Sequence, residues 1–359
     1  MSKPFETLMR LLLSCSLSCT LLVLSSGLAA HAHAEVHSPW DRLPVTLSNV
    51  PTNCPVEPDL PADLTTDGFY RADDPTHSIV DPALMKAYSE SSGPVKNAAH
   101  VIVDMADRFR ATGSPEAAQC TLRLLAQMAH NDTMAGHMSS RQAYYVQGWL
   151  AGAMADAYLK VRGSGLGTLE QAKAIGTWLG KLGDSTRTWY DAAEKEHPAQ
   201  NNHLYWAGAE IASIAAVSNR KDLLDWALAT YKNGVDQIEP DGTLPLEMAR
   251  GQRALHYHLY ALAPLVFIAE MGEANGQDLY AYRDHALSRL VAVCVHGLSD
   301  PSLFEQRTSV KQEVPKHTSG DDAWWTKPYG RRFPSPQIAD ITAHAGTLSS
   351  FYLGGLPPE

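Results

Sequence analysis

Two short stretches of the sequence carry side chains that can hold an anion and move protons. The first runs from Gln200 to Trp206 and the second from Leu246 to His258. On a helix with roughly 100° between successive residues, Asn202, His203 and Trp206 lie on one face. An exposed helix face is ordinarily rich in Lys and Glu, whereas this one combines an amide, an imidazole and an indole. These residues therefore predict a site rather than a simple solvated surface.

The second stretch adds a guanidinium and a phenol. Arg250 and Tyr257 are seven residues apart, which predicts a shared face if one helix contains both. Leu255 and Leu259 lie away from that face and are expected to pack into the core. An amide and a guanidinium suit a carboxylate, while an imidazole and a phenol can act as general base and acid.

Both stretches resemble the hallmark motifs of the mannuronate-specific alginate lyases, polysaccharide lyase family 5. The run Asn201-Asn202-His203-Leu204-Tyr205-Trp206 is similar to one motif, and the segment from Leu244 to His258 is similar to the other. The resemblance covers most of the chain and is strongest between Asn201 and Ala292. It implies an all-α chain folded as an incomplete (α/α) toroid of helical hairpins, with a substrate groove or tunnel.

The resemblance implies cleavage of 1,4-linked polyuronates by β-elimination between C4 and C5. Asn202 and Arg250 would neutralise the C6 carboxylate, which makes the C5 proton acidic. His203 would assist or act as base. Tyr257 would protonate the leaving O4, and as a phenol close to Arg250 it could also take the C5 proton.

Further residues are expected to bind substrate, by weaker analogy. Trp206 is expected to be a sugar-stacking platform, and at least one of His256 and His258 to support the site. Lys86 and Tyr88 would belong to a lid near residues 80–95. The other expected contacts are His100, which stands where the family tends to have Arg, together with Arg141, Arg253, His256 and Arg331. The resemblance also implies a disulfide between Cys54 and Cys120, while Cys294 reads as a buried thiol.

The first 34 residues read as an export signal. A basic start with Lys3 and Arg10 precedes an apolar run, and small-x-small sites end at Ala34. Residues 35–359 are then expected to form one catalytic domain, monomeric, periplasmic or secreted, with no membrane contact after signal removal. No metal-ligand spacing is evident, so no cofactor is expected.

The net charge of the chain indicates which kinds of binding partner it can have. The chain has a formal net charge of −10, and residues 1–34 contribute one net positive charge, so the remainder carries about −11. This balance argues against nucleic acid and still permits an anionic polysaccharide in a locally basic cleft.

Helical periodicity dominates the chain in order. An extended arm is expected over residues 36–74 and a short helix or flap over 82–92. Later helices are expected at 96–111, 114–130, 139–161, 169–195, 202–217, 220–235, 249–272 and 279–297. Lys311, Lys316, Lys327, Trp324-Trp325 and Arg331-Arg332 are expected on a loop at the cleft edge, before a last helix over 337–352.

Two other functions stay open. A glycoside hydrolase would need two carboxylates about 5–10 Å apart, for which Glu210, Glu247 and Asp241 are the candidates. A non-catalytic polysaccharide-binding protein would keep the aromatic and basic groups but would not need the phenol of Tyr257.

Overall fold

Short polar residues cap the starts of the helices, and these caps fix where the chain turns. In the computed structural model, Asp81, Ser114, Ser140 and Asn201 each accept a hydrogen bond from a backbone N–H of the first helical turn. The structure describes residues 35–56, 58–73, 79–196 and 200–358, without the side chains of 193–196. The predicted export signal, residues 1–34, lies outside the described residues.

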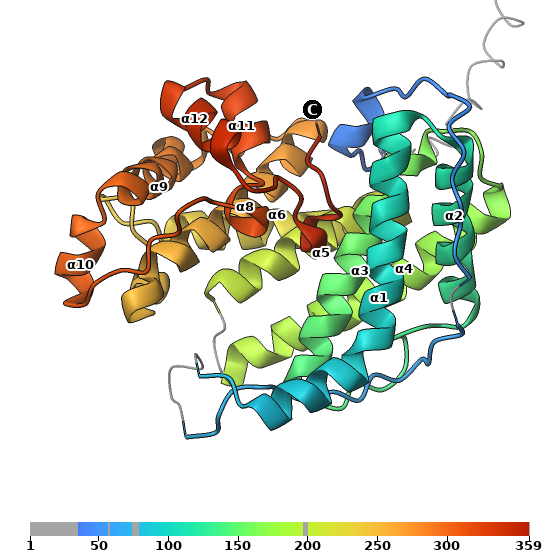
Figure 1. Cartoon of the computed structure of the whole chain (residues 1–359), viewed down its shortest axis with the longest axis horizontal. Helices are drawn as coiled ribbons and strands as arrows, with labels where there is room; N and C mark the ends of the chain where they lie inside the picture. The colour runs from blue at the N-terminus through green and yellow to red at the C-terminus, as the bar shows by residue number, and fades with distance from the viewer. Residues whose placement is uncertain (1–34, 57, 74–78, 197–199, 359) are drawn as a thin grey trace, which may run out of the picture. The chain divides into compact units, whose positions relative to one another are not determined.

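Helices make up the regular structure of the described residues, apart from isolated bridges (Figure 1). The α-helices are α1 (Pro82–Thr112), α2 (Pro115–His130), α3 (Arg141–Arg162), α4 (Leu169–Glu196), α5 (Asn202–Ser218), α6 (Lys221–Asp236), α7 (Pro245–Met248), α8 (Ala254–Ala274), α9 (Tyr282–Ser299), α10 (Ser302–Thr308), α11 (Thr326–Arg332) and α12 (Pro336–His344). Single 3₁₀ turns are η1 (Pro39–Arg42), η2 (Gly251–Arg253), η3 (Gly320–Asp322) and η4 (Phe351–Leu353). The described residues from Val36 onward form one compact unit.

The helices form two layers. In the inner row α1 packs on α3, α3 on α5 and α5 on α8, while α2, α4, α6 and α9 pack against this row from outside. Helices α3, α5 and α8 are buried over most of their circumference. Leu255 and Leu259 of α8 are fully buried, as predicted. The segment Gly251–Ala274 is long and apolar enough to span a membrane, but 83% of that window is buried inside the protein, which fits a core helix.

Several predicted boundaries are wrong. The expected flap at 82–92 is the first part of the 31-residue helix α1, which continues through Pro94. The expected last helix over 337–352 ends at His344, and only a 3₁₀ turn follows at Phe351–Leu353. The Trp324-Trp325 pair, expected at a cleft edge, is buried at 1% and 0% exposure because indole rings fill the core beside α8.

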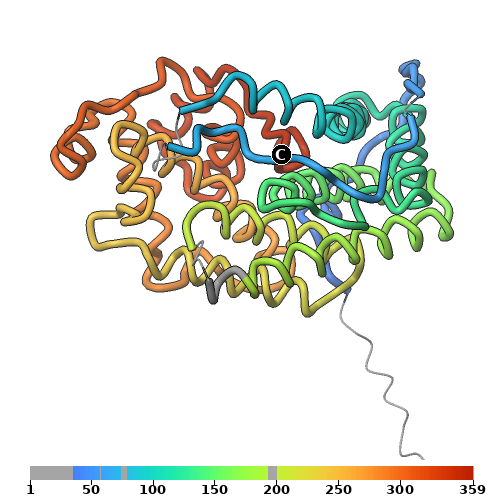
Figure 2. Tube along the Cα trace, turned by 90° about the horizontal axis from the view of Figure 1, so that it is seen from below, coloured from blue at the N-terminus to red at the C-terminus, as the bar shows by residue number. Residues whose placement is uncertain are grey.

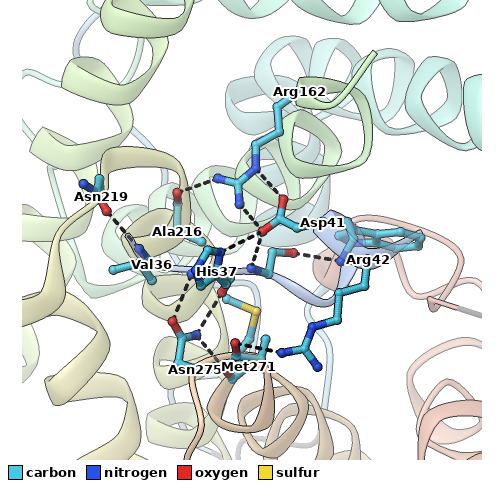
Figure 3. A network of polar contacts seen from close by, with 12 residues as sticks. Val36, His37, Asp41, Arg42, Arg162, Ala216, Asn219, Met271 and Asn275 are labelled. Carbon is cyan, nitrogen blue, oxygen red and sulfur yellow. Dashed lines mark hydrogen bonds and ion pairs between the residues drawn. The ribbon is translucent and has the colours of Figure 1, made fainter. Parts of the chain in front are cut away.

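The start of the described chain is hydrogen bonded to residues at the C-terminal ends of α3, α5 and α8 (Figure 3). The backbone N–H of Val36 donates to Asn219 at 2.9 Å, and that of His37 donates to Asn275 at 2.9 Å. Arg162, at the end of α3, donates to Asp41 at 2.8 Å and to the carbonyl of Ala216 at 2.8 Å. These contacts connect the arm to α3, α5 and α8.

From there the arm runs along the molecule to the far end of α1 (Figure 2). A disulfide joins Cys54 of the arm to Cys120 of α2, with Cα atoms 5.5 Å apart, as the family resemblance implied. Beyond it, Leu64 bridges to Met138 and Tyr70 to Val80. These contacts place residues 68–72 beside the N-terminal ends of α3, α5 and α8. Cys294 is buried and unpaired, as expected.

Candidate active site

A cavity of about 770 Å³ opens where the arm passes the N-terminal ends of α3, α5 and α8. Its walls come from five parts of the chain: the arm, the start of α3, the last third of α4, the start of α5 and the segment from Arg250 to Tyr260. The lining residues are Gly68, Phe69, Tyr70, Arg71, Ala72, Ser140, Arg141, Gln142, Tyr145, Trp149, Trp189, Asn201, Asn202, His203, Arg250, His256, Tyr257 and Tyr260. No Asp or Glu lies among these described lining residues, whereas three arginines do. The cavity is therefore suited to an anion.

Asn202 stands at the first turn of α5, where Asn201 caps the helix by accepting from the backbone N–H of His203. The side-chain Nδ2 of Asn202 donates to both carboxylate oxygens of Glu247, at 3.0 and 2.9 Å. Its backbone N–H donates to the same carboxylate at 2.7 Å. The Oδ1 of Asn202 is buried and has no hydrogen-bond partner in the protein. Asn202 thus lines the cavity, and its hydrogen bonds to Glu247 fix its position.

His203 follows on the same turn and stacks on Tyr145 of α3, with ring centroids 4.7 Å apart and 8° between planes. Its backbone carbonyl accepts a hydrogen bond from the hydroxyl of Tyr190 at 3.0 Å. Desolvation inside the cavity, and then the positive charges of Arg250 and Arg141, lower the pKa of His203 to about 4. The imidazole is therefore neutral at neutral pH, so it can accept a proton but supplies no standing positive charge.

Arg250 and Tyr257 meet in the cavity, but not as residues of one helix. Gly251 adopts a φ of +61°, which a glycine tolerates, and the chain makes a 3₁₀ turn before α8 begins at Ala254. The predicted helix over 249–272 therefore begins late. The turn folds Arg250 back so that its Cζ lies 3.9 Å from the ring centroid of Tyr257. Arg253 approaches the same ring at 5.1 Å.

The two histidines that flank Tyr257 have different surroundings. His256 lines the cavity, and its Nδ1 lies 3.1 Å from a carboxylate oxygen of Asp322. His258 points into the core, where its Nε2 accepts from the backbone N–H of Leu244 at 2.8 Å. Burial lowers the pKa of His258 to about 4. His258 thus supports the backbone between α6 and α7 without reaching the cavity.

Trp206 does not lie at the cavity, so the expectation of a stacking platform is wrong for this residue. Its side chain is 1% exposed and packs against Tyr260, with ring centroids 4.8 Å apart. The face that it shares with Asn202 and His203 runs down the axis of α5, and one turn below the cavity that face is already covered by α8 and Tyr352.

Four other expected contacts also lie away from the described cavity wall. Lys86 is exposed and pairs with Glu90 on α1, and Tyr88 is buried against Phe69. His100 stacks on Phe351 at 3.6 Å, and Arg331 binds Glu270 at 3.0 Å. The long helix α1 carries the predicted lid residues along its own axis, so the segment at the cavity is 68–72 instead. Of the expected subsite cations, Arg141 lines the cavity.

Aromatic residues outside the two sequence motifs form much of the wall. Tyr145 and Trp149 are one turn apart on α3, and Trp189 lies on α4. Trp189 is partly exposed, packs face to face on Tyr144 at 5.4 Å and meets Tyr145 edge to face at 5.5 Å. In the sequence these residues form a cluster of Tyr and Trp at helical spacing on two successive helices. The same pattern is equally typical of a buried core, so only the tertiary packing distinguishes a cavity wall from a core.

The carboxylates considered for hydrolysis are not placed as a catalytic pair on this cavity. Glu210 is buried at 4% exposure two turns below His203, and Glu247 is fully buried behind Asn202. Asp241 binds Thr243 and Arg307. Among the residues that the structure describes, no three His, Cys, Asp or Glu side chains converge as a metal site requires.

Comparison with known proteins places this arrangement in a family. The model of the family described as Alginate lyase matches residues 68–304. A polysaccharide lyase of Stenotrophomonas maltophilia is 36% identical over 87% of this chain and 95% of its own length. An alginate lyase of Azotobacter vinelandii is 31% identical over 96% of this chain and 93% of its own length.

Solved structures agree on the fold. Alginate lyase A1-III from Sphingomonas species A1 superposes with a TM-score of 0.69 and 24% identity, covering 85% of this chain and 84% of that one. A variant of alginate lyase A1-III in complex with a tetrasaccharide superposes with a TM-score of 0.75 and 21% identity, over 90% of this chain and 95% of that one. The fold is the α/α toroid that the family resemblance implied.

Proposed function

Because this chain belongs to the alginate lyase family, we propose that it cleaves poly-β-D-mannuronate by β-elimination in the cavity between α3, α5 and α8. The observation that carries the proposal is the convergence of Asn202, His203, Arg250 and Tyr257 on one cavity whose described lining residues include no carboxylate. A polysaccharide with one carboxylate per sugar fits such a basic, aromatic cavity, and the tetrasaccharide complex of a structural relative supports a sugar ligand.

In the proposed reaction the C5–H bond gives up its proton, the C4–O4 bond breaks and a C4=C5 double bond forms. Arg250 neutralises the C6 carboxylate with a planar pair of N–H donors. Tyr257 protonates the departing O4 and, for syn elimination, also takes the C5 proton. His203 is a neutral acceptor in the same wall, available as the base or as a hydrogen-bond partner.

Stereochemistry supports the choice of mannuronate. In β-D-mannuronate the axial H5 and the equatorial O4 leave from the same side, so one phenol can serve both. β-D-Glucuronate differs only at C2, and glucuronan and the glucuronate linkage of hyaluronan are therefore secondary substrates in this proposal. α-L-Guluronate is inverted at C5 and needs groups on opposite faces, so polyguluronate should be spared.

One assay separates this proposal from hydrolysis and from binding alone. Purified mannuronan, glucuronan, hyaluronan and polyguluronate are each incubated with the protein across a range of pH. Elimination produces a conjugated product that absorbs in the ultraviolet, hydrolysis produces reducing ends without that absorbance, and a binding protein produces neither. Rapid cleavage of polyguluronate beside inert mannuronan would overturn the stereochemical argument.

We also propose that the protein is exported to the periplasm and works there as a monomer. The basic and apolar start of the sequence and the disulfide between Cys54 and Cys120 support export, because disulfides persist in oxidising compartments. Cell fractionation with N-terminal sequencing of the mature protein tests the location and the cleavage site, and light scattering tests the monomer.

A further inference from the structure

Near its C-terminus the chain forms a tight turn against the inner helices. The 3₁₀ turn η4 (Phe351–Leu353) packs on α3 and α5, within the red C-terminal segment of Figure 1. Ser350 and Gly355 close the turn through two backbone hydrogen bonds of 3.0 and 2.7 Å. Gly354 and Gly355 have φ angles of +72° and +99°, a region that favours glycine. Residues 350–356 therefore form a defined unit, the C-terminal hook.

Buried charged groups hold the hook in place. Lys160 of α3, whose side chain is fully buried, donates hydrogen bonds to the carbonyl of Gly354 and to the carboxylate of Asp107 on α1. The backbone N–H of Leu356 donates to the same carboxylate at 2.9 Å. A Cβ atom on Gly354 would lie 2.5 Å from the Cβ of Asp156, so the hook also fits closely against α3. Because a buried charge without partners is costly, this cluster resists displacement of the hook.

Tyr352, in the middle of the hook, packs against a ring that lines the cavity. Its ring centroid lies 5.2 Å from that of Trp149, which is in turn 5.8 Å from that of Tyr145, one turn earlier on α3. Trp149 and Tyr145 both line the cavity. Tyr145 then stacks on His203 at 4.7 Å. A row of aromatic rings thus begins in the C-terminal hook and ends at a residue of the proposed active site.

Trp149 depends on the hook more than Tyr145 does. Tyr145 also contacts the rings of Trp189 and Tyr190, whereas the ring contacts of Trp149 in the described structure are with Tyr145 and Tyr352. One side of the indole lines the cavity, so that side offers no close packing to hold it. Removing the ring of Tyr352 would leave a void beside Trp149, into which the indole can turn.

Resting on the lyase function proposed above, we infer that Tyr352 is a positioning residue for sugar binding, which holds the indole of Trp149 in the cavity wall. The C-terminal hook is thus part of the substrate-binding structure, although none of its residues is among the described lining residues. A flat apolar indole face can pack on the C–H groups of a sugar ring, and this contact requires a fixed orientation. Displacing the indole weakens binding of the polysaccharide, while Arg250 and Tyr257 keep their places and the chemistry.

A double-mutant cycle tests the role of Tyr352. Tyr352→Ala should raise KM for mannuronan about 3–10-fold and change kcat by less than about threefold, because it removes one aromatic pair and no reacting group. Tyr352→Phe keeps the ring and should retain the wild-type KM. In a Trp149→Ala background, Tyr352→Ala should change KM by less than about twofold, because the indole that it positions is gone. Independent, multiplicative effects on KM would overturn the inference.

Phe351→Ala is the matched control, because Phe351 lies beside Tyr352 in the same turn and is likewise half-buried. The ring of Phe351 stacks on His100 of α1, with centroids 3.6 Å apart, and contacts no ring of the cavity wall in the described structure. Phe351→Ala should therefore lower the melting temperature and leave KM unchanged. Equal increases in KM from Phe351→Ala and Tyr352→Ala would overturn the assignment of Tyr352, since general loosening of the hook would explain both.

Binding to a variant that lacks the proposed acid is a second measurement, independent of turnover. In a Tyr257→Phe background, calorimetry with a mannuronate tetrasaccharide should show that Tyr352→Ala raises Kd about 3–10-fold. If circular dichroism shows that Tyr352→Ala does not fold, Tyr352→Leu takes its place, because leucine fills much of the space without a flat ring. A wild-type protein that cleaves no polyuronate would contradict the proposed lyase function. A wild type that cleaves mannuronan, with KM and Kd unchanged in the folded variant, would contradict only the role of Tyr352.

Discussion

The guanidinium of Arg250 lies over the ring of Tyr257, with its Cζ 3.9 Å from the ring centroid. The two residues come from different elements, Arg250 from the turn before η2 and Tyr257 from the first turn of α8. Their contact therefore depends on the reversal at Gly251. In the proposed reaction one contact fixes both the carboxylate ligand and the proton donor, so altering either residue should disturb the other.

Replacing either partner should abolish most turnover while leaving the fold. Tyr257→Phe keeps the ring under Arg250 and removes only the hydroxyl. Arg250→Lys keeps the charge but loses the guanidinium over the ring and its paired donors. Each should lower kcat roughly 10²–10³-fold, the usual cost of one transition-state contact. Initial rates of ultraviolet absorbance on mannuronan measure this, and near-full turnover by Tyr257→Phe would show that the acid is another group.

Two arginines that sequence reasoning treated alike should behave differently. Arg141 lines the cavity, whereas Arg331 binds Glu270 on α8 and lies away from it. Arg141→Ala should raise KM for polymannuronate because it removes a positive charge that lines the cavity proposed to bind the polysaccharide. Arg331→Ala should leave KM unchanged and lower the melting temperature, since it leaves a buried carboxylate with one partner fewer. Equal KM effects from both would argue for a substrate path beyond this cavity.

Trp189 and Trp206 should have different roles, Trp189 in the cavity wall and Trp206 in the core. Trp189→Ala removes a partly exposed indole from the cavity wall, and we expect a higher KM with little change in stability. Trp206→Ala removes a buried indole, which should cost about 3–5 kcal/mol of unfolding free energy. Denaturant unfolding and saturation kinetics on the same two variants measure both quantities. A Trp206→Ala protein that is fully stable but binds sugar poorly would contradict the packing described here.

His203 should titrate near pH 4. The pKa falls from 6.5 to about 4 on folding, so between these values the unfolded chain binds the proton and the folded protein does not. This difference makes stability rise with pH from about 4 to 6.5. Asp156 and Asp321, whose burial raises their pKa from 3.8 to about 6, oppose the trend in the same interval. The unfolding free energy of wild type and of His203→Phe is therefore measured across this pH range, and the difference between the two curves gives the contribution of His203. NMR titration of the imidazole checks its pKa directly.

Breaking the disulfide should loosen the arm more than the helices. Cys54 and Cys120 are 66 residues apart, and closing a loop of that size stabilises by roughly 2–4 kcal/mol. Cys54→Ser with Cys120→Ser should therefore lower the unfolding free energy by about that amount in oxidising buffer. Cys294→Ser is the control, because that buried thiol makes no disulfide. Hydrogen exchange that rises first in residues 43–72 would locate the effect in the arm.

A strong chelator should leave turnover unchanged. In the proposed reaction the positive charge that neutralises the carboxylate comes from Arg250, and no cluster of metal-ligating side chains occurs among the described residues. Loss of activity in EDTA with recovery on added calcium would point to a metal-dependent elimination instead.

Much of this protein can be predicted from its sequence because the relevant signals are local. Helical periodicity and capping residues are properties of neighbouring positions, and they predict α2 to α6 within a few residues. The motifs around Asn202 and Tyr257 likewise lie in continuous stretches, so the family and the four central residues follow from the chain alone. The buried leucines of α8 also follow from their spacing.

The tertiary structure decided which side chains reach the cavity. Periodicity assigns Trp206 to the face of Asn202, but whether that face meets sugar or protein depends on α8 and Tyr352, which are distant in sequence. Trp189 looks like core until α4 is placed beside the start of α5. Glu247 looks like half of a hydrolytic pair until α7 carries it behind Asn202. Each outcome depends on packing between elements that are far apart in the chain, and a local pattern holds no information about that packing.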